Sequence, residues 1–220
     1  MGNAQMELGQ LEQSRLNQEA ALAIHREVGN RLPECFVLCS LGNVLRNQGQ
    51  LERALACYES ALAIAREIGN PLGEGYTLFN LGDLRARQGR LDEAVSCCRQ
   101  GVALLHQVHN KHTEGSARGV LADVLMRGGR LGEARAELQA GEALQRETGD
   151  RPGLAVLLCI RGRLDHLEGD LDSAQAALAE AEAIAEQVGA GPLSEVGTAV
   201  PALRALLAGA TQTNRTRGER

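Results

Sequence analysis

Three histidines spaced by three residues are the first candidates for chemistry in this sequence of 220 residues. His106, His109 and His112 could present imidazole nitrogens to a zinc ion, which binds such ligands readily. No fourth ligand follows at a usual spacing, and Lys111 lies among the histidines. A solvated helix end and turn is therefore the favoured interpretation, and the sequence predicts no metal site.

A second candidate is His166, which lies beside Asp165 and near Glu168 and could transfer protons with them. No nucleophile accompanies this group, and the segment around it has the pattern of a buried core. The pair Gly128-Gly129 also lacks the Lys-Ser/Thr step that completes a phosphate-binding loop. We therefore predict no catalytic residue, no cofactor and no enzyme activity.

The composition indicates an aliphatic core and excludes some classes of partner. Hydrophobic residues make up 44% of the chain but aromatic residues only 2%, and tryptophan is absent. The net charge is -5 with both signs interspersed, which argues against a nucleic-acid surface. The longest apolar run, Leu154 to Ile160, is far shorter than a membrane span, so no membrane partner is predicted.

The cysteines and the start of the chain indicate a cytoplasmic protein. None of the six cysteines forms a Cys-x-x-Cys pair, and several recur at the same phase, as small core residues do. Met1 is not followed by the basic and apolar stretches of a secretory signal. We interpret the cysteines as reduced thiols. The single lysine among 23 basic residues is typical of a GC-rich bacterial genome.

Glycines at a regular spacing mark the repeats along the chain, and we call this series the glycine ruler. Glycines recur at intervals of 40 residues, each at the start of a phrase such as Gly-Gln-Leu-Glu or Gly-Arg-Leu-Asp. Self-similarity at a period between 20 and 50 residues is typical of repeat architectures. The glycines of this ruler are Gly9, Gly49, Gly89, Gly129, Gly169 and Gly209.

Each repeat predicts two antiparallel helices of about 16 and 19 residues, as judged from apolar spacing. In the copy over 72–111, the first helix ends at Gln88-Gly89, because glycine takes the left-handed conformation cheaply. The second helix, over 90–106, carries apolar residues at positions i, i+3, i+4 and i+7. A turn such as Gly69-Asn70 follows, often with a proline that starts the next helix. No segment alternates as a strand would.

Small residues recur at fixed phases of both helices. Only glycine or alanine there would let paired helices approach at the short end of the usual range. Overpacking by Ala94→Leu is therefore expected to destabilise the array severely. The positions are Gly42, Gly82, Ala122 and Gly162 in the first helices and Ala54, Ala94, Ala134 and Ala174 in the second.

This pattern resembles the tetratricopeptide repeat (TPR). In one copy it reads Leu41-Gly42, Gly49, Ala54, Tyr58 and Ala61, and it returns three times, with Arg161 in place of the expected leucine in the last copy. The 40-residue period, longer than the standard 34, is similar to the long-helix variant of bacterial regulators and signalling proteins. The resemblance implies an all-α, right-handed solenoid of antiparallel helix pairs that binds a protein or peptide on its concave face.

Phasing the chain against the ruler divides it into four parts. Residues 1–28 are a truncated repeat with half a first helix and a full second helix, and residues 29–188 are four complete repeats. Residues 189–208 form a capping helix, begun near Leu193, that Pro201 is expected to kink or delay, and 209–220 form a disordered tail. We expect the chain to be the C-terminal part of a longer array, the alternative being a frayed half-helix that caps it.

In the TPR family the first helices line the concave face, which implies the candidate binding residues here. Three of the four aromatic residues fall on this face in adjacent repeats, with asparagine, aspartate and arginine nearby, as a peptide-binding face requires. The alternative is that these aromatics fill gaps between repeats. The candidates are Phe36, Asn43, Arg46, Tyr76, Phe79, Asn80, Asp83, Arg87, Asp123 and Arg127.

The sequence thus favours a non-catalytic scaffold for a protein or peptide of unknown identity. One alternative is a sensory or regulatory segment of a larger bacterial signalling protein, with a kinase, cyclase or transcription regulator as its effector. Another is a self-assembly module that associates through its N-terminal face.

Overall fold

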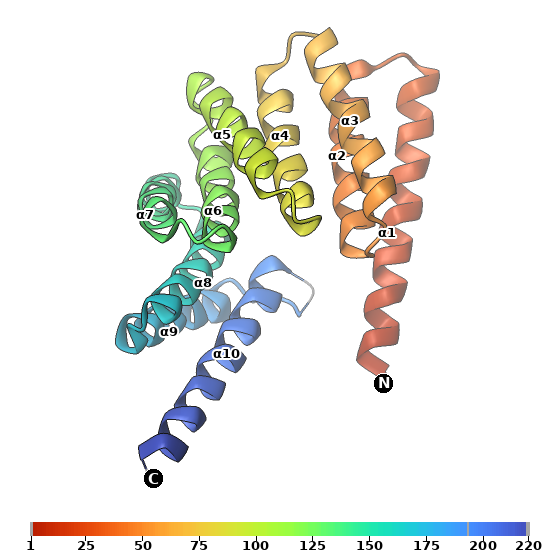
Figure 1. Cartoon of the computed structure of the whole chain (residues 1–220). Helices are drawn as coiled ribbons and strands as arrows, with labels where there is room; N and C mark the ends of the chain where they lie inside the picture. Colours follow the sequence, from red (N-terminus) through yellow and green to blue (C-terminus); the bar gives the residue numbers. More distant parts are fainter. Residues whose placement is uncertain (1, 193, 219–220) are drawn as a thin grey trace. The chain divides into compact units, whose positions relative to one another are not determined.

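The computed structural model describes the backbone of residues 2–192 and 194–218, and the side chains of 10–192 and 194–209. The described residues form ten helices and no strand (Figure 1). Two compact units divide the chain, residues 1–113 and 114–220. The helices are α1 (Gly2–Glu27), α2 (Arg31–Asn47), α3 (Leu51–Glu67), α4 (Pro71–Arg87), α5 (Leu91–Gln107), α6 (Lys111–Arg127), α7 (Leu131–Thr148), α8 (Arg151–Glu168), α9 (Leu171–Gln187) and α10 (Glu195–Gly218).

The first unit contains α1 to α5. Helix α1 packs on α2, the pairs α2/α3 and α4/α5 pack internally, and α3 packs on α4. Its core is mostly aliphatic, with the ring of Tyr58 fully buried in a cluster that includes Leu38, Leu45 and Leu84. This arrangement confirms the predicted consecutive helix pairs.

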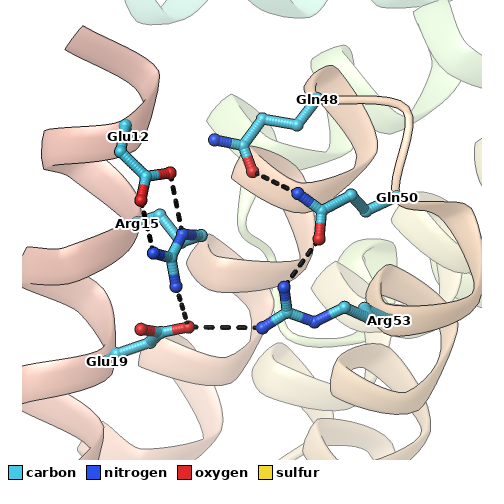
Figure 2. A network of polar contacts seen from close by, with 6 residues as sticks. All are labelled: Glu12, Arg15, Glu19, Gln48, Gln50 and Arg53. Carbon is cyan, nitrogen blue, oxygen red and sulfur yellow. Dashed lines mark hydrogen bonds and ion pairs between the residues drawn. The ribbon is translucent and has the colours of Figure 1, made fainter. Parts of the chain in front are cut away.

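A polar network also connects α1 with the α2–α3 turn and α3 (Figure 2). The Arg15 guanidinium donates to both Glu12 and Glu19, which lie one helical turn before and after it on α1. The side chain of Arg53 then donates to Glu19 at 3.4 Å and to Gln50 at 2.6 Å. Arg15 occupies the phase at which the next second helix has Leu55, so charge replaces an apolar contact at this position.

The second unit contains α7 to α10 and nearly all of α6. Helix α8 packs on both α7 and α9, and α10 packs on α8 and α9. Leu158, Ile184, Val200 and Leu203 are buried in the core of this unit. The close fit of α10 is visible at Gly162, where an added Cβ would lie 2.7 Å from Leu203 Cδ2.

Left-handed residues end the helices as the glycine ruler predicts. Gly49, Gly89, Gly129 and Gly169 have φ between 72° and 85°. Each turn carries a paired hydrogen-bond motif, such as Gln50 N–H to the Leu45 carbonyl at 2.9 Å, which satisfies the last carbonyls of the helix. Glycines also occupy the turns after the second helices at residues 29, 69, 149 and 189, whereas the equivalent turn at residue 109 has His109 with φ 55°.

The two ends of the ruler differ from the prediction. Gly9 lies inside α1, which is one continuous helix, so the expected break between a half-helix and a second helix is wrong. The eight residues before Gly9 are too few to form a separate packed helix, and continuing the helix keeps one backbone hydrogen bond per residue. Gly209 likewise lies inside α10.

The C-terminal boundaries are corrected in the same way. Helix α10 begins at Glu195 and continues through Pro201 to Gly218, so the start is not delayed to the proline and the tail is helical over 209–218. A proline in the seventh helical position removes one backbone donor, and the alanine and leucine residues that follow it as far as Ala208 are strong helix formers. Leu193 and residues 219–220 lie outside the described residues.

The small residues have the predicted steric role. Ala54, Ala94, Ala134 and Ala174 are all completely buried. A Cβ at Gly82 would lie 2.3 Å from the Cys98 sulfur and 3.0 Å from the Ala94 carbonyl oxygen. Helix pairing in this chain therefore depends on backbone approach at these positions. Over the described residues, no helix is both long and apolar enough to cross a membrane.

Candidate binding face on α2 and α4

The first helices α2 and α4 of the first unit pack directly on each other and bring the three candidate aromatics together. The Tyr76 ring lies in edge-to-face contact with Phe36 at a centroid distance of 6.4 Å and with Phe79 at 5.2 Å. Phe36 and Tyr76 are half-buried, whereas Phe79 is only 7% exposed. Phe79 therefore supports the Tyr76 ring from within, and the accessible aromatic surface belongs to Phe36 and Tyr76.

Asn43 lies between two tyrosines. Its amide oxygen accepts a hydrogen bond of 2.6 Å from the Tyr58 hydroxyl, and its amide nitrogen donates to the Tyr76 hydroxyl at 3.4 Å. Burial raises the pKa of Tyr58, so its hydroxyl stays protonated as a donor well into the alkaline range. The Asn43 amide thus fixes the aromatic cluster. Its oxygen is engaged by Tyr58, which leaves the longer hydrogen bond to Tyr76 as the weaker one.

Next to the aromatics, one buried aspartate joins two arginines. Asp83 is 8% exposed, and its Oδ2 accepts from Arg46 Nη1 at 2.9 Å and from Arg87 Nε at 3.0 Å. The Arg46 side chain is mostly covered, but the Arg87 side chain is 45% exposed. The buried carboxylate therefore orients Arg87 while leaving part of its guanidinium to solvent. Asn80 is buried and donates to the Tyr76 carbonyl one turn earlier on α4.

The second unit repeats the aspartate arrangement with its own residues. Asp123 on α6 pairs with Arg127 at 2.6 Å and with Arg163 of α8 at 2.8 Å. The Arg163 side chain is 41% exposed. Asp123 and Asp83 thus have the same phase and the same role, each held between an arginine of its own helix and one from a neighbouring first helix.

A recurring ion pair was missed in the sequence. Arg26 Nε lies 3.0 Å from Glu34 Oε1, and 40 residues later Arg66 Nε lies 2.8 Å from Glu74 Oε1. Each pair links the end of a second helix to the start of the following first helix. The signal was present as an Arg and a Glu eight residues apart in successive repeats.

The histidine candidates show no catalytic or metal arrangement among the described residues. His106, His109 and His112 are exposed, and within the described ranges no group of three or more His, Cys, Asp and Glu side chains could hold a metal. Both carboxylates near His166 are engaged elsewhere, since Asp165 and Glu168 bind Arg135.

Comparisons with known proteins agree with this architecture. The family model described as the MalT-like TPR region matches residues 1–151, which is more than half of the chain. No curated protein sequence matches.

Solved structures of similar fold come from several sources. A Podosopora anserina putative kinesin light chain with nearly identical TPR-like repeats is 20% identical, with 83% of this chain and 90% of that one covered and a TM-score of 0.59. BtubC (BKLC) from P. vanneervenii is 18% identical, with 94% and 87% covered and a TM-score of 0.68.

A third structure is the Rap conjugation gene regulator of plasmid pLS20 in complex with the Phr* peptide. It is 20% identical, with 96% of this chain and 62% of that one covered and a TM-score of 0.68. At such identities the likeness is one of fold: repeated helix pairs that pack consecutively.

Proposed function

Since the chain belongs to the family of MalT-like TPR regions, we propose that it is a non-catalytic scaffold that binds a protein or peptide along the face of its first helices. The observation that carries this proposal is that half-buried Phe36 and Tyr76 pack together and that the partly exposed Arg87 lies on the same stripe of α4 as Tyr76, about three helical turns further along. Aromatic surface and an oriented guanidinium on one face are typical of binding hot spots.

The contacts of this face indicate what it would recognise. An apolar or aromatic side chain would pack on Phe36 and Tyr76, and a carboxylate or backbone carbonyl would accept from Arg87. Asn43 supports the tyrosine and is not required to touch the ligand. In this proposal Arg87 supplies the donors to the ligand.

The similarity in fold to the Rap regulator bound to the Phr* peptide supports a peptide as one kind of partner. It also supports the regulatory alternative, in which these repeats receive a peptide within a larger bacterial regulator. The scaffold function and the regulatory function would use the same face. They differ in whether peptide binding controls an effector domain.

A selection with displayed random peptides tests the proposal. Peptides enriched on the wild-type chain would be synthesised with a fluorophore and titrated by fluorescence polarisation against Phe36→Ala and Arg87→Gln. We expect each variant to weaken binding by about tenfold, near 1.4 kcal/mol. Arg66→Gln is the control, because Arg66 is similarly exposed but lies on the second helix α3. Equal binding to all variants, with unchanged circular dichroism, would contradict the choice of face.

A second candidate function is self-assembly through the N-terminal helices, which a separate observation favours. Leu16, Ile24, Val28 and Leu32 are between 46% and 67% exposed on α1, the turn after it and α2. Association would remove this apolar surface from water. Light scattering of wild type and Ile24→Glu over a range of concentrations tests it, and a monomer at every concentration would exclude it.

A further inference from the structure

The face formed by α2 and α4 has two chemically different ends. Phe36 and Tyr76 lie in the second turn of their helices and are half-buried, so they give this end an accessible aromatic surface. Arg87 is the last residue of α4, and its side chain is 45% exposed. Tyr76 and Arg87 lie on one stripe of α4, about 16 Å apart along the helix axis. The face therefore has an aromatic end and a cationic end.

Between these ends, the described side chains of the face are polar. Ser40 and Asn43 are half-buried and lie on the same stripe of α2 as Phe36. Asn80 and Asp83 occupy the middle of the α4 stripe and are buried. A ligand would therefore find apolar contact at the aromatic end, an exposed charge at the cationic end and hydrogen-bonding groups between them.

The cationic end carries a net positive charge. Two guanidinium groups share one carboxylate there, since Asp83 Oδ2 accepts from Arg46 Nη1 at 2.9 Å and from Arg87 Nε at 3.0 Å. The contact between Asp83 and Arg87 uses Nε, so the Nη groups of Arg87 can donate to a further acceptor. The whole chain has a net charge of -5, so the sign of the charge at this end is opposite to that of the protein.

This local charge favours one kind of acceptor. A carboxylate is attracted by the net charge and can accept two parallel hydrogen bonds from a guanidinium, whereas a neutral carbonyl gains the hydrogen bond alone. The second unit has the same excess of guanidinium groups, with Asp123 between Arg127 and Arg163. Charge complementarity therefore indicates an acidic partner.

The distance between the two ends determines the spacing of groups in such a partner. An extended peptide advances about 3.3 Å per residue, so about five residues cover the distance from Tyr76 to Arg87. A helical peptide would need about eleven, and it would require a continuous apolar surface to receive its anchors. The polar middle of the face, with Ser40 on it, suits the exposed backbone groups of an extended chain instead.

We propose that this face binds an extended acidic peptide in which a carboxylate lies about five residues from an aromatic or large apolar side chain. The apolar side chain packs on Phe36 and Tyr76, and the carboxylate accepts from Arg87. This inference rests on the peptide-binding function proposed above and adds the chemical class and the spacing of the ligand.

A displayed peptide library with a fixed phenylalanine between randomised residues tests the spacing. The library is selected in parallel on wild type, Arg87→Gln and Arg66→Gln, and the enriched sequences are counted. We expect aspartate and glutamate to be enriched about five positions from the phenylalanine on wild type and Arg66→Gln, but not on Arg87→Gln. Arg66→Gln is the matched control, because it removes the same charge from a similarly exposed side chain on α3.

Synthetic peptides from the wild-type selection then measure the contact by fluorescence polarisation. Replacing the acidic residue by its amide should weaken binding to wild type about three- to tenfold and leave the affinity for Arg87→Gln unchanged. A peptide that ends at this position, made with a free and with an amidated C-terminus, shows whether a terminal carboxylate serves as well as an acidic side chain. Either source of the carboxylate supports the proposal.

The outcomes separate this inference from the proposed function. Enrichment of acids about eleven positions away, or no acidic preference among peptides whose binding Phe36→Ala weakens, would overturn the inference and leave the binding face supported. Peptides bound equally by wild type, Phe36→Ala and Arg87→Gln, or no enriched peptide at all, would contradict the binding face itself. The spacing measured on wild type decides even if Arg87→Gln does not fold.

Discussion

The Tyr58 hydroxyl on α3 donates a hydrogen bond of 2.6 Å to the Asn43 amide oxygen on α2. The Tyr58 ring is completely buried against Gly42, where an added Cβ would lie 2.6 Å from Tyr58 Cε1. A core residue of the helix pair therefore fixes the asparagine that in turn holds Tyr76 on the candidate binding face. Stability and the geometry of that face are coupled through this one contact.

Removing the Tyr58 hydroxyl tests the coupling. Tyr58→Phe keeps the ring in place but leaves the Asn43 oxygen without its donor, so we expect a loss of about 0.5–1.5 kcal/mol in unfolding free energy. Urea denaturation followed by circular dichroism measures it. Tyr76→Phe removes the longer 3.4 Å hydrogen bond to Asn43 and is the comparison, with a smaller expected effect. Equal losses in the two variants would indicate that the Tyr58 contact has no special role.

Close approach of α4 and α5 gives a second prediction. Ala94→Leu would force a larger side chain into a completely buried site, and Gly82→Ala would place a Cβ against the Ala94 carbonyl. We expect each to destabilise the chain by about 1–3 kcal/mol or more, seen as a lower melting temperature. Ala103→Leu on the exposed side of α5 is the control and should change little. A melting temperature like that of wild type for Ala94→Leu would refute the packing role.

Substitution of His109 by glycine is predicted to stabilise the chain, whereas the substitutions above are predicted to destabilise it. His109 is the one described residue other than glycine with positive φ, at a turn where four equivalent positions have glycine. A left-handed conformation costs a side-chain-bearing residue about 1 kcal/mol, partly offset by the greater flexibility of glycine in the unfolded chain. His109→Gly should therefore raise stability by about 0.5–1 kcal/mol, a few degrees in melting temperature. The reverse control, Gly149→Ala, should lower it, and a decrease in both would contradict the explanation.

The interior of the array could be predicted because the same residue types recur at the same positions in successive repeats. The left-handed glycines, the buried alanines and the alternation of helices followed from positions such as Gly89 and Ala94, which recur every 40 residues. The ends could not, since Gly9 begins the same Gly-Gln-Leu-Glu phrase as Gly49 and yet lies inside α1, and Gly209 lies inside α10. Tertiary packing, and not the glycine alone, decides whether such a residue ends a helix.

The sequence predicted that the candidate aromatic residues share a face but not how their side chains contact one another. Phase alone indicated that Phe36, Tyr76 and Phe79 share a face, but it could not show that Phe79 is covered or that Asn43 is held by Tyr58. Such contacts depend on distances between side chains of different helices. The ion pair between Arg161 and Glu142 could not be predicted for a similar reason: the sequence shows that Arg161 replaces a leucine, but not which carboxylate lies 2.7 Å from it.

The six cysteines provide a last prediction, because their side chains differ in how far they are buried. Cys57 is half-buried, whereas the other five are buried. Burial raises the pKa of the Cys159 thiol to about 11, so only about one molecule in a thousand has that thiolate at pH 8. Burial also raises the pKa of Cys57, so its reaction should accelerate as the pH rises toward that value, since the thiolate is the nucleophile.

Ellman's reagent should therefore modify one thiol of the native chain at pH 8, and all six in urea. Cys57→Ser should remove the fast reaction, whereas Cys97→Ser, at the same phase one repeat later but buried, should leave it unchanged. Fast modification of a second thiol in native buffer, or a fast phase that survives Cys57→Ser, would show that the core opens at these positions more readily than its packing indicates.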